Sequence, residues 1–546
     1  MESKWWENAV GYQLYPRSFQ DTNYDGIGDI QGIRKRLPYL KELGVDFLWI
    51  NPMYQSPNID NGYDISDFYK LNPEFGNLDE FIELLDAAHQ MGIKVLVDLV
   101  VNHTSDQHPW FLESKKSKDN PYREYYHWAE ATPEKMPNNW QSFFGGSTWT
   151  YDEHTEQAYF HVFAKEQPDL NWTNPKVREE IYQMIRWWLE LGVDGFRLDA
   201  ISHIQKESWD FKITSNPWAP FMNVSGIENY MAELSTIFRE YQVMTVGEAS
   251  GVTSHEAIKW TGNHGFLDMI FELEHNVKIG NPGEEKTSII GFKKVMQRWQ
   301  MDLLKGGWQA LYIENHDLPR SISTMGNGTI ESAKAIAIAY FLMRGTPFIY
   351  QGQEIGMANY PFRTIEEVDG EDTKYFYYSL LNQGISEKKA LKLALNWSRD
   401  HSRTPMQWSA DCQAGFSEVA SWLPVHPNYR QVNVENEKNR QGSLLLFYQE
   451  LISLRKKIVE FTKGSITFYL KKHPYVICYT REFQRLGALV VVNLSEKKQK
   501  VDLPKWIISN QKTILLKNYT EEKVFTSRIE LLPYEAAVIR YVNPKK

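Results

Sequence analysis

Short apolar segments alternate with amphipathic stretches along most of the chain. Stretches such as 78–91 and 177–191, in which apolar residues recur every three or four positions, indicate helices. Eight runs rich in Val, Ile, Leu and aromatic residues begin near Val10, Val45, Lys94, Val193, Val243, Leu267, Trp308 and Thr346. Continuous apolar strands followed by helices favour a parallel sheet covered on its outer face, so eight such units predict a (β/α)8 TIM barrel, an α/β fold. An open doubly wound sheet is the alternative, but no Gly-x-Gly-x-x-Gly loop follows the first strand.

The spacing of these runs locates the insertions. The third and fourth runs start 99 residues apart, which is about twice the spacing of their neighbours. We therefore predict a barrel over 1–103 and 173–459, a small inserted domain over 104–172 after the third strand, and a further insert over about 360–440. From 460 to 546 the pattern changes to short strands such as ITFYL and EAAVIRYV, which predict a C-terminal antiparallel β-sandwich.

Composition narrows the class of protein. The 546 residues carry a net charge of −9, which argues against nucleic acid or an anionic membrane as a partner. The two cysteines, Cys412 and Cys478, offer no disulfide framework. The longest apolar run, 335–343, is far shorter than the about 18 residues that span a bilayer, and the N-terminus has no signal-peptide pattern. We expect a cytoplasmic protein, monomeric or dimeric, that binds a small molecule; its 14% aromatic residues suit sugar rings as well as a large core.

Polar residues stand where the predicted strands end. In a TIM barrel the active site lies at the C-terminal ends of the strands, so side chains placed there converge on one mouth. They are Asp98, Asn102 and His103 on the third strand, Arg197 and Asp199 on the fourth, Glu248 on the fifth, and Asn315, His316 and Asp317 on the seventh. Each alone is better explained as an ion pair or helix cap. Carboxylates gathered together without a function would destabilise the fold by repulsion.

Retaining glycoside cleavage is the chemistry that needs such a set. One carboxylate attacks the anomeric carbon while an acid about 5–5.5 Å away protonates the leaving oxygen. Asp199 suits the nucleophile, because Arg197 on the same strand face can keep it ionised. Glu248 suits the acid/base, with a pKa raised by neighbouring carboxylates. Asp317 would bind sugar hydroxyls and stabilise the positive transition state, and both histidines could donate to ring hydroxyls.

Longer motifs carry a resemblance to a known family. VDLVVNH (97–103), GFRLDAISH (195–203), VGEA (246–249) and IENHD (313–317) look like the four signature regions of the α-amylase family of glycoside hydrolases. QPDLNW (167–172), DNGYD (60–64), HDLPR (316–320), YQGQEIGM (350–357) and RTPMQW (403–408) resemble its oligo-1,6-glucosidase and α-glucosidase branch. The resemblance covers essentially the whole chain. It implies a retaining glycosidase with Asp199 as nucleophile, Glu248 as acid/base and Asp317 as transition-state stabiliser.

The resemblance also implies a pocket for the terminal glucose. Its residues would be Asp60, Tyr63, His103, Arg197, His316 and Arg403, with Phe163 and Gln167 reaching over from the inserted domain. Asp60 and Arg403 together would close the pocket behind the sugar and give exo-action. The alternative for Asp60 is a turn residue, because Asp-Asn-Gly is itself a turn signal.

The linkage that is cut depends on two departures from the branch. Members that prefer α-1,6 bonds usually carry Val directly after the nucleophile and Glu-Glu in the eighth-strand motif, where this chain has Ala200 and Gln353. The smaller side chain makes room for a differently angled acceptor, and the amide replaces a strong acceptor for its hydroxyls. We therefore predict a leaning to α-1,4 bonds, as in maltose and malto-oligosaccharides, with sucrose cleavage or transglycosylation as further activities. The alternative is an oligo-1,6-glucosidase acting on isomalto-oligosaccharides.

Other relatives fit the sequence less well. Trehalose-6-phosphate hydrolases tend to carry Gln where Leu318 stands, and sucrose isomerases carry an Arg-rich loop where this chain reads NVKIGNPGEEK. A non-catalytic scaffold, such as the barrel ectodomain of an amino-acid transporter heavy chain, would lack the three carboxylates.

An N-terminal loop predicts a metal site. The segment 21–29 places oxygen-bearing side chains at alternate positions with Gly26 sixth, as in the first part of a calcium loop, but the usual Glu at position twelve is Gly32. The alternative is an Asx-turn cluster without metal. The resemblance implies structural Ca²⁺, replaceable by Mg²⁺, and no organic cofactor. Its ligands would be Asp21, Asn23, Asp25, Asp29 and the Ile27 carbonyl.

Overall fold

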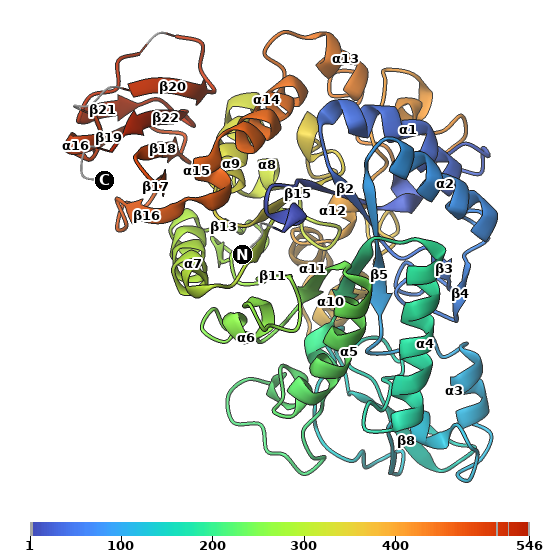
Figure 1. Ribbon diagram of the computed structural model, residues 1–546. Coiled ribbons are helices and arrows are strands. Elements are labelled where there is room, and N and C mark those ends of the chain that lie inside the picture. Colours follow the sequence, from blue (N-terminus) through green and yellow to red (C-terminus); the bar gives the residue numbers. More distant parts are fainter. Residues whose placement is uncertain (1–3, 509–511, 522, 544–546) are drawn as a thin grey trace.

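Eight parallel strands close into a barrel at the centre of the molecule. The structure is a computed structural model that describes residues 4–508, 512–521 and 523–543. Neighbouring barrel strands follow the chain order, and β15 pairs with β1 to close the ring. The predicted TIM barrel is confirmed (Figure 1). Its strands are β1 (Gly11–Leu14), β2 (Phe47–Ile50), β5 (Lys94–Val100), β9 (Gly195–Asp199), β10 (Met244–Glu248), β11 (Met269–Phe271), β14 (Gln309–Leu311) and β15 (Thr346–Tyr350).

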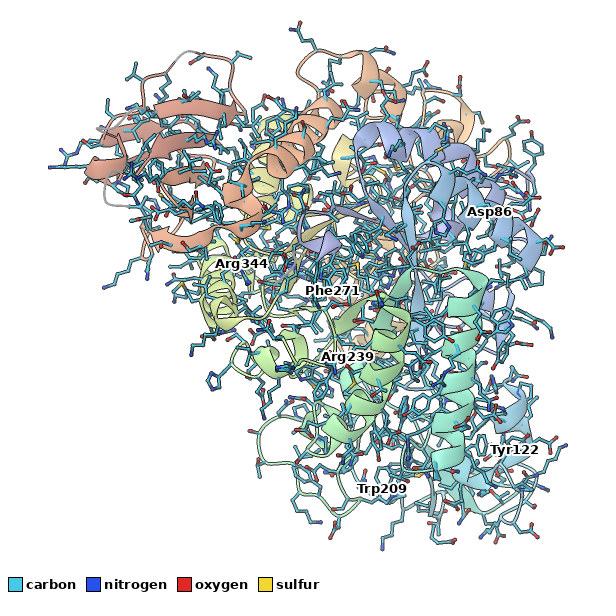
Figure 2. The ribbon with its side chains drawn as sticks, in the orientation of Figure 1. Asp86, Tyr122, Trp209, Arg239, Phe271 and Arg344 are labelled. Atoms are coloured by element: carbon cyan, nitrogen blue, oxygen red, sulfur yellow. The ribbon has the colours of Figure 1, made fainter. Side chains whose placement is uncertain are left out.

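Alternate strand residues fill the inside of the barrel. Trp49, Val246, Phe271 and Phe348 belong to one buried cluster, and Figure 2 places Phe271 near the centre of the molecule. Because side chains alternate across a strand, the residues between them face the surrounding helices. The barrel interior is therefore a packed core, and only the ends of the strands are free to form a site.

Helices with clear caps surround the strands. At the start of α2, Asn77 and Glu80 form a reciprocal capping box, and α4 begins with Asn174 before a proline and ends at Gly192 with φ 112°. These caps satisfy amides and carbonyls that a helix end leaves free. The longer helices are α1 (Ile30–Leu43), α2 (Leu78–Gln90), α4 (Pro175–Leu191), α5 (Ile227–Tyr241), α7 (Ile289–Asp302), α9 (Ile330–Phe341) and α14 (Leu444–Lys457).

Two insertions stand over the barrel mouth. Between β5 and β9 lie α3 (Pro109–Ser114) and a small antiparallel sheet of β6 (Trp128–Glu130), β8 (Gln157–Phe160) and β7 (Trp149–Asp152), shown in cyan in Figure 1. After β15 come α10 (Glu371–Asn382), α11 (Glu387–Leu395), α12 (Asp400–Arg403) and α13 (Val434–Asn439). A buried ion pair between Lys206 and Asp169, 2.8 Å long, ties the first insertion to the loop after β9.

The C-terminal region is a β-structure, as predicted. The main sheet has the order β16 (Ser465–Tyr469), β17 (Val476–Phe483), β18 (Leu486–Asn493), β22 (Ala536–Val542) and β20 (Lys512–Lys517). Two further strands, β19 (Gln499–Asp502) and β21 (Arg528–Leu531), pair with each other, and the sequence pattern does not indicate them.

Among the described residues no helix is long and apolar enough to cross a membrane.

Candidate active site

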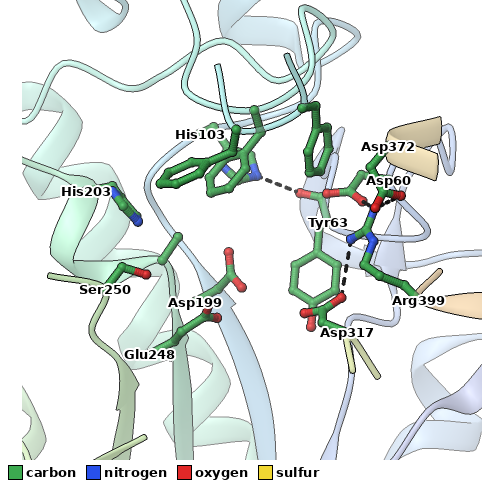
Figure 3. Close-up of a pocket in the computed structure, with 14 residues that line it drawn as sticks. Asp60, Tyr63, His103, Asp199, His203, Glu248, Ser250, Asp317, Asp372 and Arg399 are labelled. Carbon is green, nitrogen blue, oxygen red and sulfur yellow. Dashed lines mark hydrogen bonds and ion pairs between the residues drawn. The ribbon is translucent and has the colours of Figure 1, made fainter. Parts of the chain in front are cut away.

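A cavity of about 300 Å³ lies at the C-terminal ends of the barrel strands. Figure 3 shows Asp199 and Glu248 near its base, with Asp60 and Arg399 together on one side and His203 and Ser250 on the other. Eight residues predicted from the sequence line it: Asp60, Tyr63, His103, Phe163, Asp199, Ala200, Glu248 and Asp317. Arg197, His316, Gln167, Arg403 and Gln353 are not among the lining residues.

Arg197 joins three carboxylates below the cavity. Its Nη1 atom donates to Asp98 and to Asp199, each at 2.6 Å, and its Nη2 atom donates to Glu248. Strand register explains the first contact, since Asp98 on β5 lies directly opposite Arg197 on β9. Asp199 follows two residues later on the same strand face. The guanidinium therefore holds Asp199 and Glu248 beside each other, although it lies too deep to line the cavity itself.

One positive charge faces three carboxyl groups here, which shapes their protonation. Burial raises the pKa of Asp199 well above its ordinary value and also raises that of Glu248; the charge of Glu248 adds to the rise at Asp199, and the charge of Asp317 adds to the rise at Glu248. Arg197 opposes the rise at both groups. Two carboxyl groups held on one guanidinium favour a state with one proton between them, because two carboxylates side by side repel each other. This arrangement supplies both a carboxylate and a carboxylic acid at one pH.

Asp317 sits in the opposite environment. Burial acts to raise its pKa, but His316, Arg399 and Arg403 outweigh that effect and hold the pKa well below its ordinary value. Arg403 donates to Asp317 at 2.9 Å, and Arg399 does so at 3.3 Å. With 34% of its side chain exposed to the cavity, Asp317 is a fixed negative charge available to a ligand.

A hydrogen-bonded chain orients Tyr63 and His316. The Gln13 amide donates to Nδ1 of His316 at 2.8 Å, which places the ring proton on Nε2, toward Asp317 at 3.0 Å. The Tyr63 ring stacks on His316 with centroids 5.4 Å apart, and the Tyr63 hydroxyl lies 2.8 Å from Nε2. His316 therefore lies behind Tyr63 and acts on the cavity through its neighbours.

The inserted domain supplies part of the cavity lining. Phe163 lines the cavity and packs edge-on against His103, whose pKa is lowered by burial, so the ring is neutral. Gln167 is fully buried and donates to Asp60 at 3.1 Å. The expected reach of this domain over the site holds for Phe163, whereas Gln167 supports Asp60 from behind.

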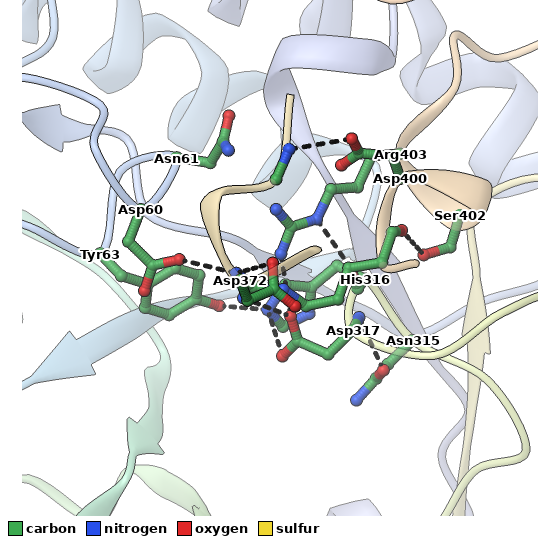
Figure 4. Close-up of polar contacts among 12 residues, drawn as sticks. Asp60, Asn61, Tyr63, Asn315, His316, Asp317, Asp372, Asp400, Ser402 and Arg403 are labelled. Atoms are coloured by element: carbon green, nitrogen blue, oxygen red, sulfur yellow. Dashed lines mark hydrogen bonds and ion pairs between the residues drawn. The ribbon is translucent and has the colours of Figure 1, made fainter. Parts of the chain in front are cut away.

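Arg399, rather than Arg403, closes the cavity with Asp60. Arg399 Nη2 lies 3.2 Å from Asp60 and 2.9 Å from Asp372, and both carboxylates line the cavity with it (Figure 3). Arg403 is completely buried and donates to the His316 carbonyl and to Asp317 (Figure 4). The predicted partnership of Asp60 with Arg403 is therefore wrong, because the arginine one helical turn earlier occupies that place.

Gln353 does not face the cavity, which corrects a second expectation. Its amide donates to the hydroxyls of Tyr340 and Tyr448, 3.1 and 3.0 Å away, in a buried layer between β15 and the outer helices. The loop after β15 turns this side chain away from the mouth. The argument for α-1,4 bonds that rested on Gln353 therefore has no structural support.

Ala200 lines the cavity directly after Asp199, as expected. Its backbone has φ 44° and ψ 30°, which is the left-handed region. A β-branched side chain is strongly disfavoured in that conformation. This backbone conformation therefore favours a small residue at position 200, and the small side chain of Ala200 leaves space in the cavity.

The loop 21–29 is held by its own hydrogen bonds. Asp21 accepts from the amides of Asn23, Tyr24 and Gly26 and from the Ser417 hydroxyl, and Asp29 caps α1 through the Gly32 amide. No Lys or Arg pairs with the loop's three aspartates among the described residues. That part of the chain also holds no group of three or more His, Cys, Asp or Glu side chains spaced for a metal.

Six lining residues were not anticipated from the sequence: Phe143, Phe144, His203, Ser250, Asp372 and Arg399. Arg399 had a signal, since it stands four residues before Arg403 and the pair could share a helix face. His203 and Ser250 follow the ends of β9 and β10, in the same kind of position as the predicted residues Asp199 and Glu248. Phe143, Phe144 and Asp372 come from the insertions, where no periodicity points to a site.

Comparisons with known proteins agree with this geometry. A family model described as "Alpha amylase, catalytic domain" matches residues 13–464, and "Alpha-amylase SusG C-terminal domain" matches 476–538. A Bacillus subtilis protein named "Probable oligo-1,6-glucosidase 3" is 45% identical over 98% of this chain and 99% of its own. The "Oligo-1,6-glucosidase" of Parageobacillus thermoglucosidasius is 44% identical over the full length of both.

A solved structure extends the agreement to three dimensions. The isomaltulose synthase SmuA from Protaminobacter rubrum superposes with a TM-score of 0.94 at 39% identity, covering the whole of both chains. The barrel, the carboxylates at its mouth and these full-length similarities lead to one conclusion. The chain belongs to the α-amylase family of glycoside hydrolases, in the branch of the oligo-1,6-glucosidases and α-glucosidases.

Proposed function

We propose that this glycosidase is an exo-acting, retaining α-glucosidase that releases glucose from the non-reducing end of short α-1,6-linked oligosaccharides. The observation that supports it most is the pair Asp199 and Glu248 on one guanidinium, at the base of a cavity that Asp60 and Arg399 close. A shared guanidinium suits the short carboxyl separation of about 5–5.5 Å in retaining enzymes.

The reaction would proceed in two displacements. Asp199 attacks the anomeric carbon while Glu248 gives its proton to the glycosidic oxygen, so that bond breaks and a glucosyl ester forms. Glu248, now a carboxylate, then takes a proton from water, whose oxygen attacks the anomeric carbon and frees Asp199. Asp317 remains ionised throughout and offers its negative charge to the oxocarbenium-like transition state.

Exo-action would follow from the closed end of the cavity. Arg399 spans Asp60 and Asp372, and its guanidinium also lies 5.1 Å from the Phe144 ring. The terminal sugar would meet this ion-paired wall with the hydroxyls of its non-reducing end, which charged donors and acceptors bind well. A longer chain could not continue past it.

The preference for α-1,6 bonds rests on the names of the relatives and replaces the leaning to α-1,4 bonds. The two full-length relatives described above carry the name oligo-1,6-glucosidase, one of them as a probable member. Hydrolysis of α-1,4 bonds is the second candidate, and Ala200 on the cavity wall favours it. A panel of maltose, isomaltose, sucrose, trehalose and panose decides between them. We expect the highest kcat/KM for isomaltose; a higher value for maltose would establish the second candidate.

Substituting Ala200 tests how linkage is chosen. Ala200→Val should raise the isomaltose-to-maltose ratio of kcat/KM about tenfold, because two added methyls narrow the acceptor side of the cavity. Because Val disfavours the positive φ of this position, Ala200→Val should also have a lower melting temperature than the wild type. Ala200→Gly is the control, which relieves the backbone without adding bulk. An unchanged ratio in the valine variant would remove Ala200 from the account of linkage.

We also propose that the loop 21–29 binds a structural Ca²⁺, replaceable by Mg²⁺. Asp21 and Asp29 are buried, and burial, with a smaller effect of Asp21, raises the pKa of Asp29. Oxygen ligands with unbalanced negative charge suit a hard cation, which would replace some of the loop's amide contacts. Asp21, Asn23, Asp25, Asp29 and the Ile27 carbonyl would hold it.

Chelation provides the test of this metal site. Adding a chelator to the calcium-loaded protein should lower the melting temperature by about 2–4 °C and leave activity at 25 °C unchanged. Asp25→Asn should lower the melting temperature of the calcium-loaded protein and reduce the response to chelator. A melting temperature indifferent to calcium and chelator would refute the metal site, and lost activity alone would give the metal another role.

The remaining proposals concern the partner and the setting. A neutral oligosaccharide is the expected substrate, and we expect a monomer in the cytoplasm. Size-exclusion chromatography with light scattering tests the first of these two expectations, and fractionation of cells tests the second.

A further inference from the structure

A second cavity of about 660 Å³ adjoins the catalytic one. Phe144 and Phe163 line both cavities. Chain neighbours also divide between them: Ile59 lines the second cavity and Asp60 the catalytic one, while Glu371 lines the second and Asp372 the catalytic one. The two cavities therefore share a wall, which includes the ion pairs of Arg399 with Asp60 and Asp372.

The second cavity has the chemistry of a sugar site. Its volume falls in the range of about 300–1,000 Å³ typical of small-molecule sites. Tyr375 and Phe144 offer aromatic surface, and Glu166 and the Tyr375 hydroxyl offer polar groups. Flat apolar faces beside mixed donors and acceptors suit a pyranose ring.

The charge of the lining excludes anionic ligands. Asp369, Glu166 and Glu371 carry negative charge in the lining, and Glu371 is paired with Lys374 at 2.9 Å; Lys165 is the one full positive charge among the lining residues. Lys165 lies 3.7 Å from Glu166, so its charge is already balanced. Phosphorylated or acidic sugars would be repelled by this lining, whereas a neutral sugar meets no such repulsion.

Two glycines, Gly145 and Gly146, allow the backbone of the inserted domain to pack against the Tyr375 side chain. Gly145 and Gly146 have φ of 94° and 76°, and a Cβ on Gly145 would lie 2.0 Å from the Tyr375 ring. The turn after Phe144 can therefore rest directly on the ring, which joins the inserted domain to α10. Tyr375 is half-exposed, as is Tyr378 on the same helix, but Tyr378 does not line the cavity.

We propose that the second cavity is a non-catalytic site for a neutral glucose unit, separated from the catalytic pocket by the wall of Phe144, Phe163 and the Asp60–Arg399 pair. The inference builds on the proposed α-glucosidase function only in taking glucose as the probe. It assigns Tyr375 as the side chain on which the sugar packs.

Each cavity is lined by one alanine, whose methyl group can report on ligand binding there. Ala164 lines the second cavity and Ala200 the catalytic one, so methyl NMR of alanine-labelled protein follows both during one titration with glucose. We expect both methyl signals to shift. Tyr375→Ala should weaken glucose binding reported by Ala164 about fivefold and leave that reported by Ala200 unchanged. Tyr378→Ala is the matched control and should behave as the wild type.

Two outcomes would overturn this site. The first is an Ala164 signal that stays fixed while Ala200 shifts. The second is an Ala164 titration that follows Ala200 with the same affinity in wild type and Tyr375→Ala, since that would be a shift relayed through Phe163. Hydrolysis of p-nitrophenyl α-glucoside is measured on the same samples. Its absence would refute the proposed function without bearing on the second site.

Discussion

Asp199→Asn should abolish turnover of p-nitrophenyl α-glucoside while leaving the fold intact. The amide cannot form the glucosyl ester, and the expected loss in kcat is about 10⁴-fold or more, as for other covalent nucleophiles. Asn is nearly isosteric with Asp, and Arg197 keeps Asp98 and Glu248 as partners, so packing around the guanidinium survives. Steady-state kinetics and thermal melting measure the two effects.

An exposed carboxylate supplies the control for this substitution. Asp86 on α2 is exposed and does not line the cavity, so Asp86→Asn should keep both activity and stability. Near-normal turnover by Asp199→Asn would sink the double-displacement mechanism. A large drop in the melting temperature of Asp199→Asn would mean that the Asp199 carboxyl group is needed for folding. The mechanism would then be tested with Asp199→Glu, which keeps the carboxylate but displaces it.

Glu248→Gln should lose activity in a way that depends on the leaving group. Without a proton donor, isomaltose hydrolysis should fall about 10²–10⁴-fold, because general acid catalysis is worth that much. An activated substrate such as 2,4-dinitrophenyl α-glucoside needs no proton, so its first step should be nearly unaffected. Azide should restore turnover and give α-glucosyl azide, since it attacks the ester without a base.

The pH profile gives the same carboxyl a second test. Glu248 must be protonated to donate, and burial raises its pKa, so the wild-type rate should persist above the ordinary range of a glutamic acid and fall at higher pH. Glu248→Gln should lose this basic limb, because the titrating group is gone. Equal losses on isomaltose and the dinitrophenyl glucoside, with the basic limb retained, would assign the proton donor to another residue.

The barrel could be predicted from sequence because its strands are buried on both sides. Largely apolar runs such as 94–100 mark such strands plainly, and their C-terminal ends locate the mouth of the barrel without further information. Short strand pairs could not be predicted from the sequence. One of them is β3 (Tyr54–Gln55) with β4 (Asp67–Leu71), because a two-residue strand has no periodicity to detect. The strands β19 and β21 have four residues each and are half polar or more, so they lack the apolar run that marks a buried strand.

The site residues divide along similar lines. Asp199 and Glu248 were predictable because regular strands position them. Arg399 was missed and Arg403 misassigned because both come from a long insertion, where spacing alone does not say which of two arginines one turn apart faces the cavity. Gln353 was misplaced for a related reason: the loop after β15 turns through Gly352, with φ 85°, and the direction of the next side chain depends on that turn.

The stereochemistry of the first product tests the account most directly. Proton NMR during isomaltose hydrolysis distinguishes newly released α-glucose from β-glucose before mutarotation mixes them. Asp199 and Glu248, held together on Arg197, predict that α-glucose appears first and that each cleavage releases one terminal glucose. Initial release of β-glucose would contradict the covalent mechanism, and release of larger fragments from panose or longer chains would contradict the closed pocket.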